Sequence, residues 1–195
     1  MKKNIVVFAS GSGTNFQAII DAAESGHLNA RISGLITNKK DIGSIERAKK
    51  HSIPVKIIPP TDFSSEQDFA THLIKQLEKW NADLVVLAGY LKKIPKQMIQ
   101  AYPNRILNIH PALLPKYGGK GFYGIHVHRA VLEAGEEESG CTIHIVTEAF
   151  DEGPVLAQAK VPVKKDDTPE ELANRILKEE HKLYPAVIQQ HLQNL

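Results

Sequence analysis

Asn108 and His110 are the residues whose types and spacing best suit chemistry in this sequence. The apolar run 106–109 predicts a short buried strand, and Pro111 ends it because proline has no amide hydrogen to continue a sheet ladder. Side chains alternate along a strand, so Asn108 and His110 should point to the same side at its C-terminal end. An amide donor beside an imidazole suits the stabilisation of an oxyanion and the transfer of a proton. Because no Ser or Cys stands beside them, the attacking group is expected to belong to a substrate.

Strands and helices must alternate along the chain to position this pair. Apolar, β-branched runs predict buried strands, and apolar residues at helical spacing predict the helices between them. The expected strands are 4–9, 32–37, 55–58, 84–87, 106–109, 141–147 and 155–163. The expected helices are 16–23, 42–50, one running to about Trp80, 95–101, one beginning near His126, and one from Thr168 to about Lys182. This order is typical of a single α/β domain with a Rossmann-like, doubly wound, mostly parallel sheet flanked by helices, which binds ligands beyond its C-terminal strand ends.

Capping residues and prolines define the ends of two of these helices. Asp62 or Ser64 is expected to cap the third helix. Thr168 precedes Pro169 and two glutamates, which is a favourable helix start. Pro185 is expected to break or kink the last helix before a final helical segment, because a proline inside a helix removes a hydrogen bond.

A glycine-rich turn, residues 10–15, lies between the first expected strand and the first helix. Its backbone amides and the helix dipole would attract an anion. The dinucleotide-binding fingerprint is broken, since Phe16 occupies its third glycine position and the second strand ends in Asn-Lys-Lys at 38–40, without an acid to bind a ribose hydroxyl. The turn also lacks the Gly-Lys-Ser/Thr of an NTPase loop. A tight structural turn is one alternative, but the added Ser, Thr and Asn donors favour a small phosphate site, and NAD binding is not expected.

Composition and charge limit the classes of function that are expected for this protein. The chain has 195 residues, of which 42% are hydrophobic and 24% charged, and a formal net charge of +2. These values suit one globular domain and do not predict a nucleic-acid partner. Neither a signal peptide nor a membrane-spanning run is recognised, so the protein is expected to be cytoplasmic, without a membrane partner. Cys141 is the single cysteine, which excludes an internal disulfide, and it is expected to pack in the core.

The segment 116–125 carries four glycines without a regular period, which indicates a mobile loop. His126 and His128 follow it, and on the helix expected to begin there they would not share a face. A metal site is therefore not expected, and both are interpreted as histidines at the loop edge. Arg129 suits either an anion contact or a solvated surface, and the acidic run 136–138 is interpreted as solvated surface.

Four separated motifs add to these observations. They are Gly-Ser-Gly-Thr-Asn at 11–15, Leu-Ala-Gly-Tyr at 87–90, Asn-Ile-His-Pro at 108–111 and Asp-Glu-Gly-Pro at 151–154. Taken alone, the Asn-x-His pair also fits a hydrogen-bonded structural histidine, and the last motif also fits a turn. Together, in this order, they resemble the folate-dependent formyltransferases, and among these the single-domain glycinamide ribonucleotide formyltransferase family. The resemblance implies one formyltransferase domain over 1–195, with a phosphate-binding part at about 1–100 and a folate-binding, catalytic part at about 85–195.

The resemblance also implies a reaction and a role for each matching residue. The formyl group of the co-substrate 10-formyltetrahydrofolate would pass to the amine of glycinamide ribonucleotide in purine synthesis, with no metal and no covalent intermediate. Asn108 and protonated His110 would hold the oxyanion, His110 would pass a proton to the leaving nitrogen, and Asp151 would favour the imidazolium. The residues implied to bind the ribonucleotide are Gly13, Thr14, Asn15 and Glu180. The residues implied to line the folate pocket are Leu91, Lys92, Lys93, Ile94, Asn108, Thr147, Glu148, Ala149, Phe150 and Asp151.

Two features of the chain depart from the family pattern, and Glu180 has a position that does not by itself suggest its implied role. Glu66 replaces a basic residue that is usual near the folate tail. The loop 116–128 is several residues longer than in common relatives, and we hypothesise that it acts as a lid over the folate site. Glu180 lies near the end of the last expected helix and would, on position alone, be a surface residue.

Other functions share the same chemistry. Formyltetrahydrofolate hydrolase usually carries an added N-terminal domain and methionyl-tRNA formyltransferase an added C-terminal one, so neither is expected from these 195 residues. A sugar-nucleotide formyltransferase fits the chemistry, but the phosphate loop favours the ribonucleotide. A catalytically silent folate or nucleotide binder is the alternative from a different class. Monomer and homodimer both stay open.

Overall fold

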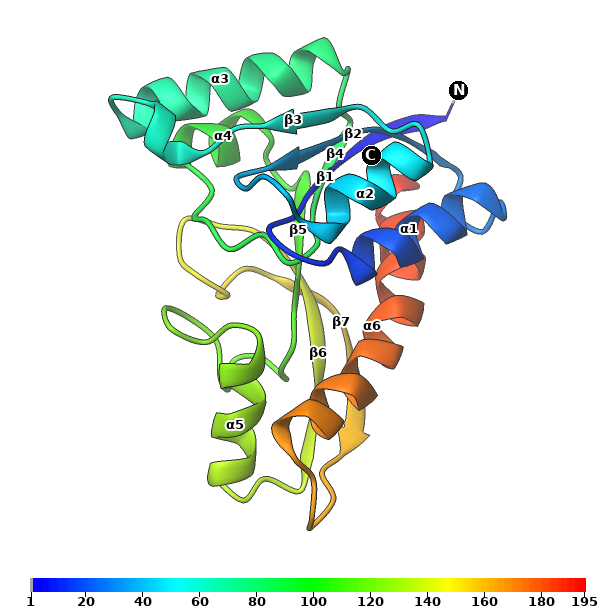
Figure 1. The fold of residues 1–195 in the computed structure, drawn as a ribbon, viewed down its shortest axis with the longest axis vertical. Helices are drawn as coiled ribbons and strands as arrows, with labels where there is room; N and C mark the ends of the chain where they lie inside the picture. Colours follow the sequence, from blue (N-terminus) through cyan, green and yellow to red (C-terminus); the bar gives the residue numbers. More distant parts are fainter. Residues whose placement is uncertain (1) are drawn as a thin grey trace.

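A computed structural model describes residues 2–195 (Figure 1). Its strands are β1 (Lys3–Phe8), β2 (Ala30–Thr37), β3 (Val55–Ile57), β4 (Leu84–Leu87), β5 (Ile106–His110), β6 (Glu138–Ile145) and β7 (Val155–Pro162). Its helices are α1 (Thr14–Glu24), α2 (Gly43–Lys50), α3 (Glu66–Lys79), α4 (Lys96–Ala101), α5 (Ile125–Glu133) and α6 (Pro169–Leu192), with a 3₁₀ turn at Pro60–Asp62. Every expected strand and helix is present, and most ends lie within a few residues of the expected ones.

The strands form one sheet in the order β3-β2-β1-β4-β5-β6-β7. β1 to β5 are parallel, whereas β6 runs antiparallel to β5, and β7 runs antiparallel to β6. The order of the strands reverses at β1, which has β2 on one side and β4 on the other. Ligands of such sheets bind beyond the C-terminal strand ends near this reversal. The expected doubly wound, mostly parallel sheet is confirmed.

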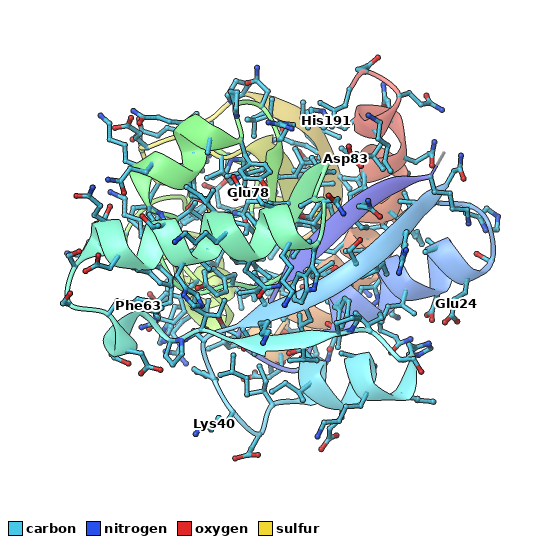
Figure 2. All side chains as sticks on the ribbon, turned by 90° about the horizontal axis from the view of Figure 1, so that it is seen from above. Glu24, Lys40, Phe63, Glu78, Asp83 and His191 are labelled. Atoms are coloured by element: carbon cyan, nitrogen blue, oxygen red, sulfur yellow. The ribbon has the colours of Figure 1, made fainter. Side chains whose placement is uncertain are left out.

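Alternating side chains give the sheet an apolar core on each face. Val7 and the residues that share its face pack with α1 and α6, whereas Val6 and Phe8 pack with α3 and α4. Figures 1 and 2 show α3 on one side of the strands and α1 and α2 on the other. Val6, Val7 and Phe8 are all fully buried, as expected for a parallel strand that is covered on both faces. Cys141 is buried in the first of these cores, as predicted.

The last helix, α6, is longer than the sequence predicts. It begins at the expected cap, where Thr168 and Glu171 exchange hydrogen bonds between side chain and backbone. Pro185 lies inside the helix without ending it. Tyr184 and Ile188 flank the proline and are fully buried in the core, and this packing outweighs the hydrogen bond that proline removes. Neither α6 nor any other helix in residues 2–195 combines the length and apolar character needed to cross a membrane.

The start of α3 also differs from the prediction. Ser65 caps this helix by accepting a hydrogen bond from the amide of Asp68. Asp62 instead belongs to the 3₁₀ turn at Pro60–Asp62. The expectation that Asp62 or Ser64 would be the cap was wrong, because this turn takes up Asp62 and delays the start of the helix.

Candidate active site

One cavity of about 760 Å³ lies beyond the C-terminal ends of β4 and β5. Its walls are formed by residues after β4, by the loop before α5, by the turn between β6 and β7, and by α6. All the residues expected to be catalytic or folate-binding line this cavity, together with Asn15 and Glu180. Gly13 and Thr14 are not among its lining residues and lie next to Asn15 at the start of α1. The cavity therefore brings together most of the predicted site.

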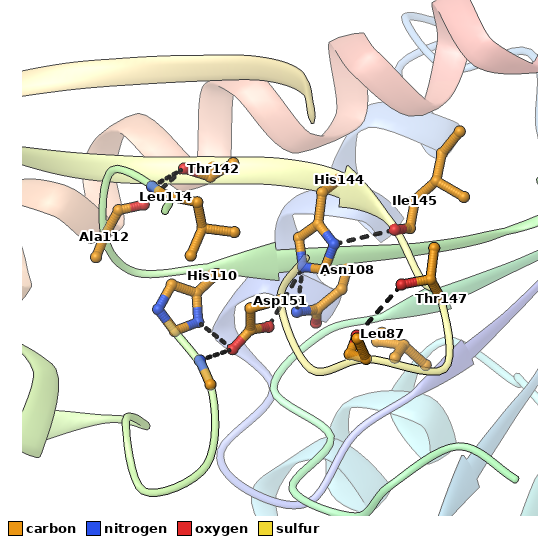
Figure 3. Close-up of polar contacts among 12 residues, drawn as sticks. Leu87, Asn108, His110, Ala112, Leu114, Thr142, His144, Ile145, Thr147 and Asp151 are labelled. Atoms are coloured by element: carbon orange, nitrogen blue, oxygen red, sulfur yellow. Dashed lines mark hydrogen bonds and ion pairs between the residues drawn. The ribbon is translucent and has the colours of Figure 1, made fainter. Parts of the chain in front are cut away.

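Asn108 lies on β5 with its amide directed towards β6 (Figure 3). Its Nδ2 lies 3.0 Å from Nε2 of His144. Nδ1 of His144 lies 3.1 Å from the carbonyl oxygen of Ile145, and a carbonyl only accepts, so Nδ1 carries the proton. Nε2 of His144 accepts one hydrogen from Asn108, and this contact fixes the orientation of the amide. The second amide hydrogen remains available to an oxyanion in the cavity.

His110 is the last residue of β5 and is only 4% exposed. Its Nε2 lies 2.7 Å from the carbonyl oxygen of Tyr117, so Nε2 carries a proton, and its Nδ1 lies 3.6 Å from Oδ2 of Asp151. Burial lowers the pKa of His110; the Asp151 charge and the Tyr117 carbonyl act to raise it, and His144 lowers it further. Burial therefore disfavours the protonated ring in the resting protein, and the protonated His110 expected during the reaction stays a prediction. Asp151 acts in the expected direction, but burial outweighs it.

Asp151 lies between the two imidazoles in the turn that joins β6 to β7 (Figure 3). Its Oδ2 accepts a hydrogen bond of 2.9 Å from the amide of Gly119, and its Oδ1 lies 3.4 Å from Nε2 of His144. Burial acts to raise the pKa of Asp151, but His144, the Gly119 amide and His110 together outweigh burial and lower it. A carboxylate anion therefore faces both rings and stabilises whichever of them gains a proton.

Gly13, Asn15 and Glu180 lie where α1 begins beside α6. Gly13 is the N-cap of α1 and has a φ of 74°. Nδ2 of Asn15 donates to Oε2 of Glu180 at 2.7 Å. Glu180 is only 6% exposed, and burial raises its pKa against the opposing effect of the Asn15 hydrogen bond. The surface position inferred for Glu180 from sequence was wrong, because α6 packs along the sheet and directs this side chain into the cavity.

His144 and His128 line the cavity as well, and sequence reasoning missed both. His144 is the pairing partner of Asn108 on β6, and its only sequence signal is a polar residue in an apolar strand. His128 is 4% exposed, and its Nδ1 has no hydrogen-bond partner among residues 2–195. The loop-edge interpretation was wrong for His128, because α5 begins at Ile125 and turns this side chain inward, whereas His126 is exposed. Within residues 2–195, no group of three or more His, Cys, Asp or Glu side chains is placed to hold a metal ion.

Replacing His128 with Gln is expected to make stability less dependent on pH. Burial, with a smaller effect of His110, lowers the pKa of His128 from 6.5 to about 4. Between these values the unfolded chain binds a proton that the folded chain does not, so the free energy of unfolding falls as the pH falls through this window. At ~1.4 kcal/mol per unit, the loss approaches ~3 kcal/mol.

Urea unfolding across this pH range measures the effect. His126→Gln is the matched control, since His126 lies on the same helix but is exposed. The wild type and the control should lose stability more steeply on acidification than His128→Gln. Equal slopes in all three proteins would contradict the buried, neutral state of His128.

The features that depart from the family pattern lie in different places. Glu66 is the first residue of α3, is exposed, and is not among the cavity-lining residues. The loop before α5 supplies residues 119–124 to the cavity wall, and its Gly119 amide reaches Asp151. The lid hypothesis stays a prediction: a folate analogue should increase hydrogen-exchange protection of this loop.

Known proteins resemble this chain in sequence and in structure. The formyl transferase family model matches residues 3–188. A chloroplastic phosphoribosylglycinamide formyltransferase from Arabidopsis thaliana is 51% identical over 96% of this chain, which spans 64% of that relative, or less than two thirds of its length. The phosphoribosylglycinamide formyltransferase of Escherichia coli K12 is 40% identical over 95% of this chain and 85% of its own. The crystal structure of glycinamide ribonucleotide transformylase 1 from Symbiobacterium toebii is similar with a TM-score of 0.93 at 40% identity, over 99% of this chain and 89% of that one.

Proposed function

The chain belongs to the formyl transferase family, and we propose that it transfers the formyl group of 10-formyltetrahydrofolate to the amine of glycinamide ribonucleotide in de novo purine biosynthesis. The observation that carries this proposal is the meeting of Asn108, His110, His144 and Asp151 at one cavity. This set supplies an oxyanion donor, a proton carrier and a carboxylate that stabilises the charged form of the carrier. The attacking nitrogen then comes from the substrate.

The two ends of the cavity suit the two substrates. Asn15 and Glu180 lie beside the start of α1, whose free amides attract a phosphate group. The ribonucleotide is therefore assigned to this end. The other end is lined by 91–94 and 147–151, which include the exposed apolar side chains of Leu91 and Phe150. An apolar surface with a few polar groups suits the flat folate ring system.

Gly13→Ala is expected to weaken ribonucleotide binding. Gly13 has a φ of 74°, and an added Cβ would lie only 2.7 Å from Cβ of Ser44, so the phosphate loop must move away from α2. The strain of such a position, of the order of 1.4 kcal/mol, corresponds to a loss of affinity of about tenfold. Affinity for a folate analogue should not change, because that ligand occupies the other end of the cavity.

Calorimetric titration with each ligand separates these effects. Gly11→Ala is the matched control, since it lies in the same loop but an added Cβ there meets nothing within 4 Å. It should weaken ribonucleotide binding much less than Gly13→Ala does. The same loss in both variants would rule out the contact with Ser44 as the cause.

The reaction begins when the amine nitrogen of the ribonucleotide attacks the formyl carbon. As the new C–N bond forms, the formyl oxygen becomes an oxyanion. The amide hydrogen of Asn108 that is not bonded to His144 donates to this oxyanion. Such a donor typically contributes about 3 kcal/mol to transition-state stabilisation in a site that excludes water. His144 holds this donor in place.

His110 moves the proton that the reaction must transfer. The attacking amine becomes positively charged and loses a proton, whereas the folate nitrogen gains one as its bond to the formyl carbon breaks. Nδ1 of neutral His110 takes the proton and passes it on, directly or through water. Asp151, 3.6 Å from Nδ1, stabilises the imidazolium in between. A lowered resting pKa suits this order, because a proton carrier must start with its accepting nitrogen free.

Spectroscopic loss of 10-formyltetrahydrofolate, with and without glycinamide ribonucleotide, tests this function. Loss only in the presence of the ribonucleotide is expected, because water has no assigned role as the attacking group. Loss without the ribonucleotide would make the protein a hydrolase. No loss in either case would contradict the proposed acceptor and leave a sugar nucleotide or a silent binder.

Location and assembly belong to the same proposal. The cytoplasmic location stays a prediction, as do the absence of nucleic-acid and membrane partners and the choice between monomer and homodimer. Sedimentation at several concentrations would measure the oligomeric state.

A further inference from the structure

A chain of contacts outside the cavity leads to His110. The hydroxyl of Tyr117 donates to Glu136 at 2.9 Å, and Nζ of Lys116 donates to the same carboxylate at 2.8 and 3.1 Å. Glu136 follows α5 and is not among the cavity-lining residues. We propose that Glu136 is a positioning residue, which holds Tyr117 so that its backbone carbonyl keeps a proton on Nε2 of His110 and leaves Nδ1 to titrate.

Tyr117 needs such an anchor because its backbone is strained. Its φ is 56°, a left-handed conformation that costs a bulky residue stability and persists only where surrounding contacts impose it. The ring packs against the core and lies 6.0 Å from the ring of Phe122, nearly perpendicular to it. Packing of the ring against the core holds the Tyr117 side chain in the loop. The hydrogen bond to Glu136 holds its hydroxyl group.

The backbone beyond this anchor holds both members of the acid–base pair. The Tyr117 carbonyl accepts from His110 at 2.7 Å, and the Gly119 amide donates to Asp151 at 2.9 Å. The residue between them is closely packed, since a Cβ on Gly118 would lie 2.5 Å from a methyl group of Leu114 and 3.2 Å from Cβ of Asp151. A shift of Tyr117 would therefore move both contacts.

Glu136 itself is held in place by its backbone and its partners. Its amide donates to the Val131 carbonyl at the end of α5, at 3.3 Å. The hydrogen bonds from Lys116 and Tyr117 lower its pKa, so it is an anion near neutral pH. Glu136 is half-buried, whereas Glu137 is exposed. The interpretation of the whole run 136–138 as solvated surface was wrong for Glu136, because the returning loop covers it.

The expected consequence is a change in the titration of His110. Asp151, His144, His128 and the Tyr117 carbonyl face this ring from four separate segments. Of these, the carbonyl and Asp151 favour the protonated ring, so moving the carbonyl away should lower the pKa of His110. The effect on catalysis rests on the proposed formyl transfer, whereas the effect on the His110 pKa does not.

Two variants remove the anchor in different ways, and NMR titration of the His110 ring in the free protein measures the outcome. Tyr117→Phe deletes only the hydroxyl, and Glu136→Ala deletes the acceptor. Both should lower the pKa of His110 and move the acid limb of the kcat/KM profile to lower pH. Each should also lower kcat about tenfold, the usual effect of losing one hydrogen bond.

Two further variants identify the contact. Glu136→Gln keeps an oxygen that accepts from Tyr117, so its His110 pKa should stay near that of the wild type. Glu137→Ala, on the exposed neighbour, should change neither the pKa nor kcat. If Tyr117→Phe and Glu136→Ala titrate His110 like the wild type, the proposal is overturned, even if their activity falls. A wild type without transferase activity would refute the proposed function and leave this titration decisive for the anchor.

Discussion

His110→Ala is expected to lower kcat about a thousandfold, within the usual range for a general acid–base residue. In the proposed reaction, the imidazole carries the proton from the attacking amine to the leaving folate nitrogen. In the resting protein its ring contacts are with the Tyr117 carbonyl and Asp151. Since its contribution is made mainly in the transition state, affinity for a folate analogue should change little.

Single-turnover kinetics and ligand titration on the same preparation measure both parts of this prediction. His27→Ala is a suitable control, because His27 is exposed and is not among the cavity-lining residues. Added imidazole should restore part of the lost rate, since a small base replaces a missing proton carrier but not a missing structural contact. If kcat of His110→Ala stays within a few-fold of the wild type, His110 is not the proton carrier.

Asp151→Asn is expected to lower kcat about a hundredfold, because the imidazolium loses its counter-charge in a site that is partly shielded from water. The substitution keeps the shape of the side chain, and the new amide oxygen still accepts from Gly119. The Asp151 charge raises the pKa of His110 against the effect of burial. Removing the charge therefore lowers this pKa further, so protonation of the resting His110 begins at lower pH. The acid limb of the kcat/KM profile should move to lower pH accordingly.

The pH–rate profile of Asp151→Asn decides between two roles for the carboxylate. Glu152→Gln is the matched control, since it removes an adjacent acid that is exposed and does not line the cavity. Its profile should coincide with that of the wild type. A lower kcat with an unmoved acid limb would mean that Asp151 acts by position and not by charge. An unchanged kcat and profile would remove Asp151 from the mechanism.

Local patterns in the sequence were sufficient to predict the architecture. Buried β-branched runs and helical spacing predicted each element, because both patterns are periodic along the chain itself. The same is true of the pair Asn108 and His110, whose common direction follows from alternation along β5. Two predicted helix boundaries differ from the structure: α6 continues past Pro185, and α3 does not begin at Asp62. There, burial of α6 and a neighbouring 3₁₀ turn outweighed the local preference.

The surroundings of the site could not be predicted in this way. His144 reaches Asn108 only because β6 runs antiparallel to β5 and places the two in register. His128 and Glu180 are buried because α5 and α6 pack along the sheet, and helical position alone does not say which face is covered. Glu136 was interpreted as solvent-exposed, because the sequence does not indicate its partner. That partner, Tyr117, contacts it from an irregular loop that periodicity does not describe.

The sequence by itself thus determined the fold, the strand that carries Asn108 and His110, and the common side to which these two side chains point. Only the tertiary structure decided the direction in which the pKa of His110 shifts. That direction depends on burial, on the Tyr117 carbonyl and on the charges of Asp151 and His144. Periodicity is a property of neighbours along the chain, whereas desolvation and charge act through space between residues that folding brings together.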